Sequence, residues 1–555
     1  MPDKKTYLAV PFWILILSLA TTVVGVADHG LWTPDEPRAA DLVASLSRPG
    51  ATLLYPMLGG KPFVEKPPLY FWLGTGTLRL LGPTLGREGA IRAASALCAL
   101  AGALLAWLVV RRFLDGGGKT AAATLLTTIA YVHSGHWIIA DPALVLFVSG
   151  AVLLAALGEE EENPVAILAA FACLGLSFLA KGLIGPVLVA PAWGAVFWIY
   201  RRNIRRHLFL HLAGAGLALA VILAWVVPFK LTAPPESWHH WFWNNQVGRF
   251  LGKTPELGHL RGPFYYLPSL PVMLLPWTPV LLGILSGRRW RELGDDHRAR
   301  RLLGICTAWA AGGLLLLSAS GTKRGIYLYP LLPAFAILAA GFSARQPRWA
   351  DWCLRGLSWI LVAVLALTGL LAVTWENEAL AWRVGLDIPA LAAAAAGALI
   401  LLRARLSSFT TAAAVTAVFV IGAGISILPR VDAAKNYREE TVRFLGAVGD
   451  GEDICAWDLD ETSRGLLGFY GNGLILPDLH DEAQPEERLG ILTETLTGRN
   501  PRCRFLVAME KRESFPPEGI KLEKKNIRAV AKLGQRRRLF LIECHEPNQK
   551  GDESR

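Results

Sequence analysis

Apolar segments of about twenty residues recur from the start of this 555-residue chain to about residue 430. Each is long enough to cross the roughly 30 Å hydrocarbon core of a bilayer as a helix. Hydrophobic residues make up 53% of the sequence and charged residues only 18%, whereas a soluble core of this size would have shorter apolar runs. The pattern predicts a mainly α-helical, polytopic membrane protein.

Thirteen candidate spans can be placed along the chain. They cover about residues 7–27, 86–110, 120–139, 141–157, 164–180, 182–200, 208–229, 267–286, 302–319, 326–343, 354–374, 387–402 and 408–428. Residues 69–82 are apolar but few and rich in glycine, so we expect a juxtamembrane helix there. The first apolar run is long and shows no small-x-small cleavage site followed by a soluble domain, which favours an uncleaved first span.

Arginine separates the loops into two sets. Short basic loops at 4–5, 111–119, 201–206, 288–301, 345–348 and 403–405 are typical of the cytoplasmic side, with an acidic exception at 159–162. Loops 28–85 and 228–266 then face outward, into the periplasm of a Gram-negative cell, and an odd number of spans places the C-terminus outside too. The chain is thus expected to be a multi-pass protein of a bacterial inner membrane. Its net charge of +11 does not indicate nucleic-acid binding, because the arginines follow topology.

The composition becomes polar after Pro429. Short β-rich runs at 453–457, 473–476, 504–508 and 538–542 alternate with helical patterns at 437–448 and 482–497. This predicts a small extracytoplasmic α/β domain over 431–555, next to a transmembrane catalytic domain over 1–430. Cys455, Cys503 and Cys544 lie in or beside the predicted strands. One disulfide among them is compatible with an oxidising compartment, but the sequence does not determine the pairing.

The loops predicted to face outward contain unusual charges. Asp35-Glu36 is bracketed by Pro34 and Pro37, which fix the backbone locally and suit preorganised carboxylates. A solvated loop start is the alternative. Ionisable groups at the membrane boundary cost several kcal/mol unless they are solvated or paired, and inward-facing ones are usually functional.

Glu65-Lys66 is held in an extended conformation by the two prolines that follow it. Lys66 held in this way suits a phosphate oxygen, and an interfacial lysine that snorkels is the alternative. Asp141 precedes Pro142 at a helix start, where a simple N-cap would also explain it.

More cations lie on the same side. Lys181 stands between two spans without a nearby acid in the sequence, so it needs an anionic partner from elsewhere in the chain or from a ligand. Lys323-Arg324 follows another span, at a place where the positive-inside rule disfavours cations. Arg249 follows an aromatic run at 238–243, which suits the membrane interface. A few acids with several cations facing a lipid layer fit a phosphate-bearing lipid substrate.

These residues resemble the motifs of the polyprenyl-phosphate-dependent membrane glycosyltransferases of GT-C type, the superfamily of the protein O-mannosyltransferases and the lipid A aminoarabinose transferase. The matching motifs, in family order, are Trp-x-Pro-Asp35-Glu36-x-Arg38-x-Ala, Glu65-Lys66-Pro-Pro68-Leu, Asp141-Pro, Ala-Lys181-Gly, the Trp-rich segment ending in Arg249-Phe250, and Lys323-Arg324-x-x-Tyr327-Leu. Thirteen spans with an external C-terminal domain are similar to the architecture of the aminoarabinose transferase.

The resemblance implies transfer of a sugar, with inversion, from undecaprenyl phosphate to an acceptor outside the cytoplasm. Its partners would be the lipid-linked donor, lipid A or another envelope acceptor, and membrane lipids. Asp35 corresponds to the catalytic carboxylate, which deprotonates or orients the acceptor. The implied site also has the acids Glu36 and Asp141, the phosphate-binding cations Lys66, Lys181, Arg249, Lys323 and Arg324, and the supporting residues Arg38, Glu65 and Tyr327.

Two departures keep alternatives open. Gln246 stands where the family often has a histidine, so we expect no required metal or other cofactor. Lys323-Arg324 resembles the general branch more than the aminoarabinose branch. Two alternatives stay open. The enzyme would transfer 4-amino-4-deoxy-L-arabinose to lipid A, or it would transfer a hexose to protein Ser/Thr or to another envelope glycan. A transporter of polyprenyl lipids is disfavoured, because the charges lie at one face and no internal repeat is evident. The sequence leaves the role of the C-terminal domain and the oligomeric state undetermined.

Overall fold

The computed structural model describes residues 7–253, 260–285, 287–375, 382–385, 387–403, 405–448, 453–482, 484, 486–510, 515, 526–533 and 537–544. The predicted cytoplasmic pair Lys4-Lys5 lies outside them. The chain forms two compact units, one of residues Met1–His29 with Val64–Val431 and one of residues Gly30–Phe63 with Asp432–Arg555. The division near residue 431 lies where the composition changes. Residues 30–63, which include Asp35-Glu36, belong to the second unit.

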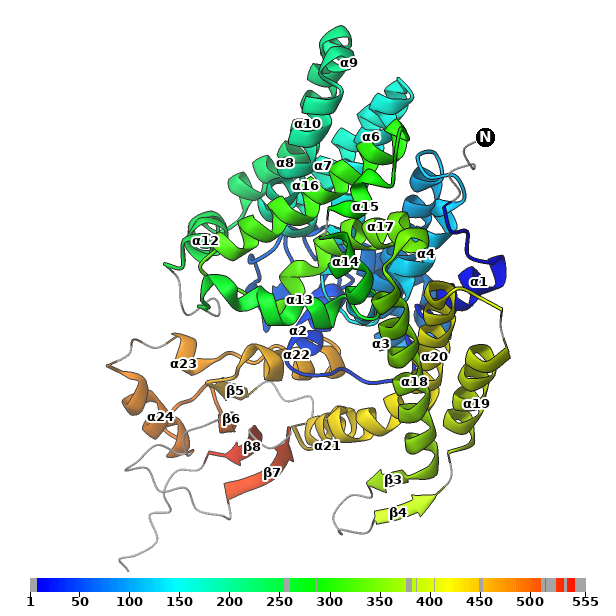
Figure 1. Cartoon of the computed structure of the whole chain (residues 1–555). Coiled ribbons are helices and arrows are strands. Elements are labelled where there is room, and N and C mark those ends of the chain that lie inside the picture. The colour runs from blue at the N-terminus through cyan, green and yellow to red at the C-terminus, as the bar shows by residue number, and fades with distance from the viewer. Residues whose placement is uncertain are drawn as a thin grey trace, which may run out of the picture. The chain divides into compact units, whose positions relative to one another are not determined.

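The first unit is helical (Figure 1). Its longer helices are α1 (Phe12–Ala20), α3 (Leu69–Val110), α4 (Gly117–Leu126), α6 (Asp141–Glu160), α7 (Pro164–Lys181), α8 (Ile184–Ile199), α10 (Leu208–Thr232), α16 (His297–Ala319), α17 (Leu332–Phe342), α18 (Arg348–Leu370), α19 (Ile388–Arg403) and α20 (Ser408–Lys435), the last of which continues into the second unit. Short helices are α5 (Ile129–Gly135), α9 (Arg201–Arg206), α11 (Pro235–His239), α12 (Arg249–Leu251), α13 (Tyr266–Met273), α14 (Thr278–Ile284) and α15 (Arg288–Arg291). A π-helix, η1 (His240–Gly248), and the 3₁₀ helices η3 (Pro263–Tyr265), η4 (Gly325–Leu331) and η5 (Ser343–Arg345) connect them, and strands β3 (Ala372–Trp375) and β4 (Trp382–Gly385) form a hairpin.

Eight helices among the described residues are long and apolar enough to cross a membrane, or nine if the bent pair α13 and α14 counts as one span. The count of thirteen stays a prediction, because the segments predicted at 7–27, 120–139, 182–200, 267–286 and 387–402 contain helices that are short or broken. The chain bends by 119° between α13 and α14, where Pro276 removes a backbone donor. In α3, Gly86 has non-helical angles (φ 70°, ψ 169°). The kink therefore separates the predicted juxtamembrane helix from the predicted span.

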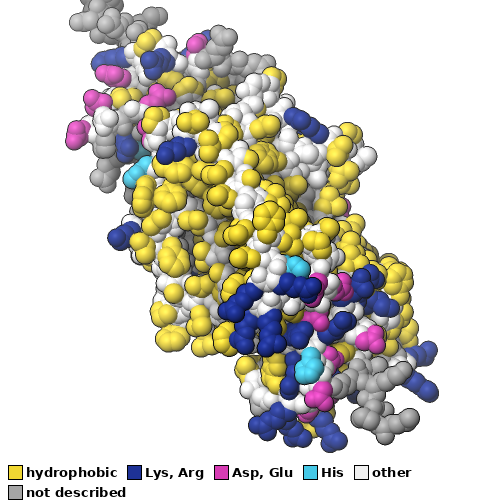
Figure 2. Space-filling view, turned by 90° about the horizontal axis from the view of Figure 1, so that it is seen from above, with side chains coloured by type: hydrophobic (Ala, Val, Ile, Leu, Met, Phe, Trp, Pro, Cys, Tyr) yellow, Lys and Arg dark blue, Asp and Glu magenta, His cyan; other side chains and the backbone are white. Residues whose placement is uncertain are grey.

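The acidic run at the end of α6 accounts for the one exception among the basic loops. Glu160 pairs with Arg298 at 3.1 Å and with Arg301 at 3.0 Å. The next two acids pair with Arg112 and Arg206, each at 3.5 Å. Lys and Arg gather beside acids and histidine on one part of the face in Figure 2, and hydrophobic side chains cover most of the rest of the visible surface. The acids therefore neutralise basic loops that the topology argument places together.

The second unit contains a four-stranded sheet in the order β5-β6-β8-β7. Its strands are β5 (Ile454–Trp457), β6 (Phe505–Glu510), β7 (Ile527–Lys532) and β8 (Arg538–Glu543), with β5 parallel to β6 and the other pairs antiparallel. The helices are α2 (Asp35–Ser45), α21 (Arg438–Val448), α22 (Glu461–Tyr470), α23 (Leu479–Glu482) and α24 (Arg488–Leu496), and β1 (Met57–Leu58) and β2 (Lys61–Pro62) form a small hairpin.

Both faces of this sheet are covered. Along β6, Leu506 and Ala508 join one apolar cluster and Val507 and Met509 join the other, as expected when successive side chains point to opposite faces. Three strands overlap the predicted runs at 453–457, 504–508 and 538–542, and α21 overlaps the predicted helix at 437–448. The run at 473–476 is not a strand, and the chain makes only a single bridge nearby, between Ala456 and Asp478. The sequence analysis missed β7 and α22.

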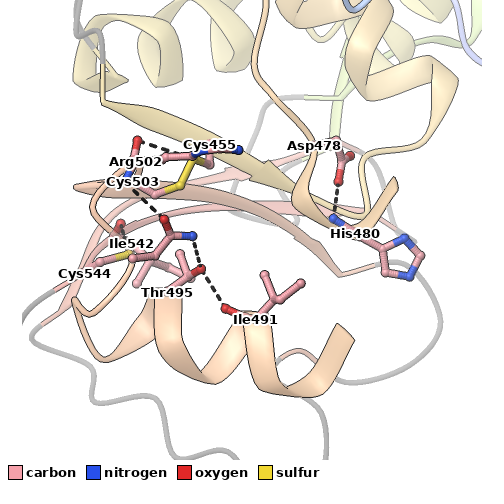
Figure 3. The surroundings of a disulfide bond; sticks show 10 residues. Cys455, Asp478, His480, Ile491, Thr495, Arg502, Cys503, Ile542 and Cys544 are labelled. Carbon is pink, nitrogen blue, oxygen red and sulfur yellow. Dashed lines mark hydrogen bonds between the residues drawn. A yellow bond between two sulfur atoms is a disulfide. The ribbon is translucent and has the colours of Figure 1, made fainter. Parts of the chain in front are cut away.

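A disulfide joins Cys455 in β5 to Cys503, which lies just before β6 (Figure 3). The Cα atoms are 5.5 Å apart, a usual separation for a disulfide. Cys544 is buried as a thiol, and burial raises its pKa to about 12. The structure thus selects one of the pairings that the sequence left open.

Replacing Cys503 by serine should lower the free energy of unfolding of the second unit by about 2–4 kcal/mol, because the crosslink closes a loop of 48 residues. Pulse proteolysis of the full chain in urea, read from cleavage within residues 432–555, measures the change. Cys353→Ser, at an exposed thiol, is the control. Equal resistance of the Cys503 variant and the wild type would contradict the assignment.

Candidate functional site

The helical unit encloses a cavity of about 350 Å³. Its walls come from the segment before α3, the start of α6, the end of α7, the start of α8, the π-helix η1, and the connection from α16 to η4. The charged lining residues are Glu65, Lys66, Asp141, Lys181 and Arg249. Apolar side chains such as Leu144, Ile184, Val187, Phe250 and Leu317 form much of the remaining wall. The cavity therefore joins a charged end to an apolar wall.

Lys181 and Asp141 form an ion pair in this cavity. The Lys181 Nζ atom lies 2.6 Å from Asp141 Oδ1, and the Asp141 side chain is only 2% exposed. The Nζ atom also lies 5.2 Å from the centre of the Tyr327 ring. Asp141 is the first residue of α6 and makes no side-chain cap, because Ala140 occupies the N-cap position. Asp141 is therefore the partner that Lys181 needed, and the simple N-cap alternative does not hold.

Arg249 follows the π-helix directly. One of its terminal nitrogens donates to Asn245 Oδ1 at 3.1 Å and lies 3.9 Å from Glu65 Oε2. Its Nε atom is buried and has no hydrogen-bond partner among the described residues. Thr322 donates to the Arg249 carbonyl at 3.2 Å. The guanidinium is thus held from two sides and keeps a donor that a ligand could use.

Gln246, where the sequence departs from the family pattern, fixes the turn after Lys181. Its Oε1 atom accepts from the Leu183 N–H at 3.0 Å. Gly182 has φ +79°, and a Cβ at that position would collide with the Gln246 side chain. The π-helix therefore positions Arg249 through Asn245 and the Lys181 turn through Gln246. Departures from α-helical to π-helical geometry occur frequently at functional sites.

Lys323 and Arg324 do not line this cavity. They line a second cavity of about 430 Å³ in the same unit, whereas Tyr327 lines the first. The structure thus brings Lys66, Lys181 and Arg249 together and separates the other two predicted cations from them. Sequence reasoning missed Asn245 and Thr322 in the first cavity. No local pattern marks the π-helix that contains Asn245, and Thr322 is an uncharged residue of a connecting segment.

Asp35, Glu36 and Arg38 lie at the start of α2 in the second unit. Asp35 Oδ1 is 3.2 Å from an Arg38 nitrogen, and Arg38 also pairs with Glu461 on α22. Glu36 is fully buried, and its Oε2 atom accepts from the Trp32 N–H at 2.8 Å. The Trp32 indole in turn donates to Asp432 at 2.8 Å. Glu36 thus fixes the chain entering α2, while Asp35 keeps a partly exposed carboxylate.

Among the described residues, no group of three or more His, Cys, Asp or Glu side chains is arranged to hold a metal ion.

The fold and part of the sequence match known proteins. The family model described as dolichyl-phosphate-mannose-protein mannosyltransferase matches residues 65–227. The crystal structure of ArnT from Cupriavidus metallidurans bound to undecaprenyl phosphate superposes with a TM-score of 0.70, at 19% identity, over 96% of this chain and 97% of that chain. This chain therefore has the same overall fold as ArnT. It is mainly helical and belongs to a multi-pass membrane protein.

Curated proteins are similar to this chain in sequence as well. The undecaprenyl phosphate-alpha-4-amino-4-deoxy-L-arabinose arabinosyl transferase of Edwardsiella ictaluri is 29% identical over 375 residues, which are 65% of each chain. A transferase of the same description from Sodalis glossinidius is 28% identical over 57% of this chain and 56% of its own. The chain thus spans less than two thirds of the length of these relatives. The family resemblance predicted from the motifs is confirmed.

Replacing Asp141 by asparagine should lower the apparent stability of the helical unit by about 3 kcal/mol, because it leaves the Lys181 ammonium without its carboxylate partner. The double variant Asp141→Asn with Lys181→Met should recover much of that loss, since no charge then stays buried. Heat unfolding of the full chain in detergent, followed by tryptophan fluorescence, measures both. A double variant no more stable than the single one would contradict the pairing.

Proposed function

We propose that the chain is an integral membrane glycosyltransferase that transfers a sugar, with inversion, from undecaprenyl phosphate to an acceptor on the outer side of a bacterial inner membrane. One observation carries this proposal: Lys66, Lys181 and Arg249 line a single cavity whose remaining wall is largely apolar. A polyprenyl phosphate has the matching chemistry, a charged phosphate attached to a hydrocarbon chain. The related transferases, whose names include undecaprenyl phosphate, support the assignment.

Lys66, Lys181 and Arg249 would act on the bond between the sugar and the lipid phosphate, which breaks in the reaction. As the sugar leaves the lipid phosphate, negative charge develops on the phosphate oxygens, and donors already in place there stabilise the transition state. Arg249 offers the buried Nε atom that has no partner among the described residues. Lys181 shares its charge with Asp141, so we assign Asp141 a role that acts through Lys181. Glu65 lies 3.9 Å from the same Arg249 nitrogen that donates to Asn245, and so helps to position the guanidinium.

We assign the carboxylate that acts on the acceptor to Asp35. Its neighbour Glu36 is buried and accepts a hydrogen bond from the Trp32 N–H, whereas Asp35 is partly exposed and lies beside the Arg38 guanidinium. The contact with Arg38 fixes the direction of the Asp35 carboxylate, and a general base must be positioned within reach of the proton that it removes. Arg38 and Glu36 therefore support Asp35 by fixing the start of α2.

For the sugar and the acceptor we propose 4-amino-4-deoxy-L-arabinose and lipid A, since the curated relatives transfer that sugar by name. Transfer of a hexose to protein Ser/Thr is the second candidate. It is favoured by the match of residues 65–227 to the protein mannosyltransferase model.

We further propose that Asp35 and the C-terminal domain face the periplasm. The Cys455–Cys503 disulfide supports this side, because such bonds persist in oxidising compartments and are rare in the cytoplasm. The basic loops around the Glu160 ion pairs support the cytoplasmic assignment of the other side.

Arg249→Gln should lower kcat for sugar transfer about a hundredfold, since it removes donors aimed at the departing phosphate. The assay is turnover of radiolabelled undecaprenyl-phosphate-linked sugar by the purified full chain. Arg298→Gln, which loses a surface ion pair with Glu160, is the matched control and should stay near wild-type activity. Donor binding without turnover in the wild type would instead indicate a transporter.

Deleting the gene should remove the aminopentose from lipid A and leave envelope glycoproteins unchanged, as read by mass spectrometry. Complementation with Asp35→Asn should restore only part of the modification, because a phosphate acceptor needs little base catalysis but still needs to be oriented. Unchanged lipid A with an altered glycoprotein would transfer the assignment to the protein acceptor. Full restoration by the Asp35 variant would remove Asp35 from the mechanism.

A further inference from the structure

The second cavity of the helical unit adjoins the first along residues 320–329. Ser320, Thr322 and Tyr327 line the first cavity, whereas Lys323 and Tyr329 line the second. One stretch of chain, the end of α16 and the start of η4, therefore forms part of both walls. The second cavity is the larger, at about 430 Å³ compared with about 350 Å³.

The second cavity is strongly basic. Its described lining residues include His133, Arg261, Lys323 and Arg324, and none of them is Asp or Glu. The first cavity, in contrast, places an acid next to its cations, with Asp141 beside Lys181 and Glu65 beside Arg249. An anion would thus meet several positive groups in the second cavity and no competing carboxylate from its described lining.

Among these residues, Lys323 gives the strongest indication that the cavity binds an anion. Only 3% of the residue is exposed. Its ammonium donates to the carbonyl of Arg261 at 3.0 Å and to the carbonyl of Ser320, and it forms no ion pair with a carboxylate among the described residues. Burial lowers its pKa. A buried ammonium without an opposite charge costs free energy, and two acceptors leave a third N–H for an anion in the cavity.

Aromatic residues around the cavity contact two of its basic groups, His133 and Arg261. The Tyr329 hydroxyl lies 2.7 Å from His133 Nδ1, and the Trp137 ring packs on His133 with the ring centres 4.5 Å apart. The Arg261 guanidinium lies 5.9 Å from the centre of the Tyr265 ring. Positively charged groups with locked side chains bind an anion at a lower entropic cost than mobile ones.

We propose that this second cavity binds a phosphate monoester other than the phosphate of the donor lipid. The cavity has four side chains with basic or ionisable nitrogens, and this number suits a ligand with two negative charges better than a ligand with one carboxylate. The arginine guanidinium also matches the geometry of a phosphate group. The phosphate could be carried by a sugar headgroup, which would make it the acceptor, or be free in solution, which would make it an effector. The inference rests on the proposed function only in assigning the donor's phosphate to the first cavity.

The test uses the full chain in phosphatidylcholine nanodiscs and measures binding by titration calorimetry. A short-chain polyprenyl phosphate probes the first cavity, and a glucosamine phosphate and inorganic phosphate probe the second. With polyprenyl phosphate saturating, we expect the wild type still to bind the second probe. Arg261→Gln should weaken that binding about tenfold and leave polyprenyl phosphate affinity within about twofold. Arg249→Gln should do the reverse, and Arg298→Gln should change neither.

The outcomes separate the hypotheses. Tighter binding of the glucosamine phosphate identifies a phosphorylated sugar as the source, and equal binding of the two probes identifies free phosphate. Competition of the second probe with polyprenyl phosphate, or no binding of either second probe, overturns the proposal. Arg261 is exposed, so its variant should fold even where the buried Lys323→Met does not. A wild type that fails to bind polyprenyl phosphate would contradict the proposed function, while the second site is still measured by its own probes.

Discussion

The buried ion pair of Lys181 and Asp141 is the contact on which the helical unit is organised. It joins the last residue of α7 to the first residue of α6, and α6 packs against α3, α7 and α8. In an apolar unit an isolated charge is costly, so the pair fixes both helix ends at one level. Tyr327, Gln246 and Gly182 then pack around the same point. The charged end of the first cavity is thus a property of how the helices meet rather than of a loop.

Much of the fold was predictable because membrane helices leave strong signals. Long apolar runs and arginine-rich loops predicted the helical unit, and alternating runs predicted three of the four strands. The number of spans was not predictable, since the chain bends at Pro276 without an interruption of the apolar pattern, whereas the kink at Gly86 falls where the sequence already divided the juxtamembrane helix from the span. Strand β7 was missed because two of its three inward positions are alanines and the exposed position between them is Val530, so its sequence lacks a clear alternation of apolar and polar residues although its burial alternates.

The sequence predicted which charged residues line the cavities better than it predicted which of them share one cavity. Motif spacing brought forward Lys66, Lys181 and Arg249, which share one cavity. It also joined Lys323 and Arg324 to them, although these two line a different cavity. A sequence cannot show which cavity each side chain of the connection between α16 and η4 enters. Asp35 and Glu36 looked equivalent in the sequence. In the structure Glu36 is buried against the Trp32 N–H, whereas Asp35 is partly exposed. Adjacent residues in a helix point in different directions, and only the structure assigns them.

Helix α6 ends in ion pairs at both extremities, Asp141 with Lys181 at one and Glu160 with Arg298 and Arg301 at the other. Acids at a helix C-terminus oppose the helix dipole, and the two arginines offset that unfavourable interaction at Glu160. Its 20 residues span roughly 30 Å, about the thickness of a hydrocarbon core. Because ion pairs hold both ends of α6, the helix resists shortening or sliding when the bilayer is thinner or thicker. The lipid must deform to match it instead, which makes bilayer thickness an external variable acting on the geometry of the cavity at its Asp141 end.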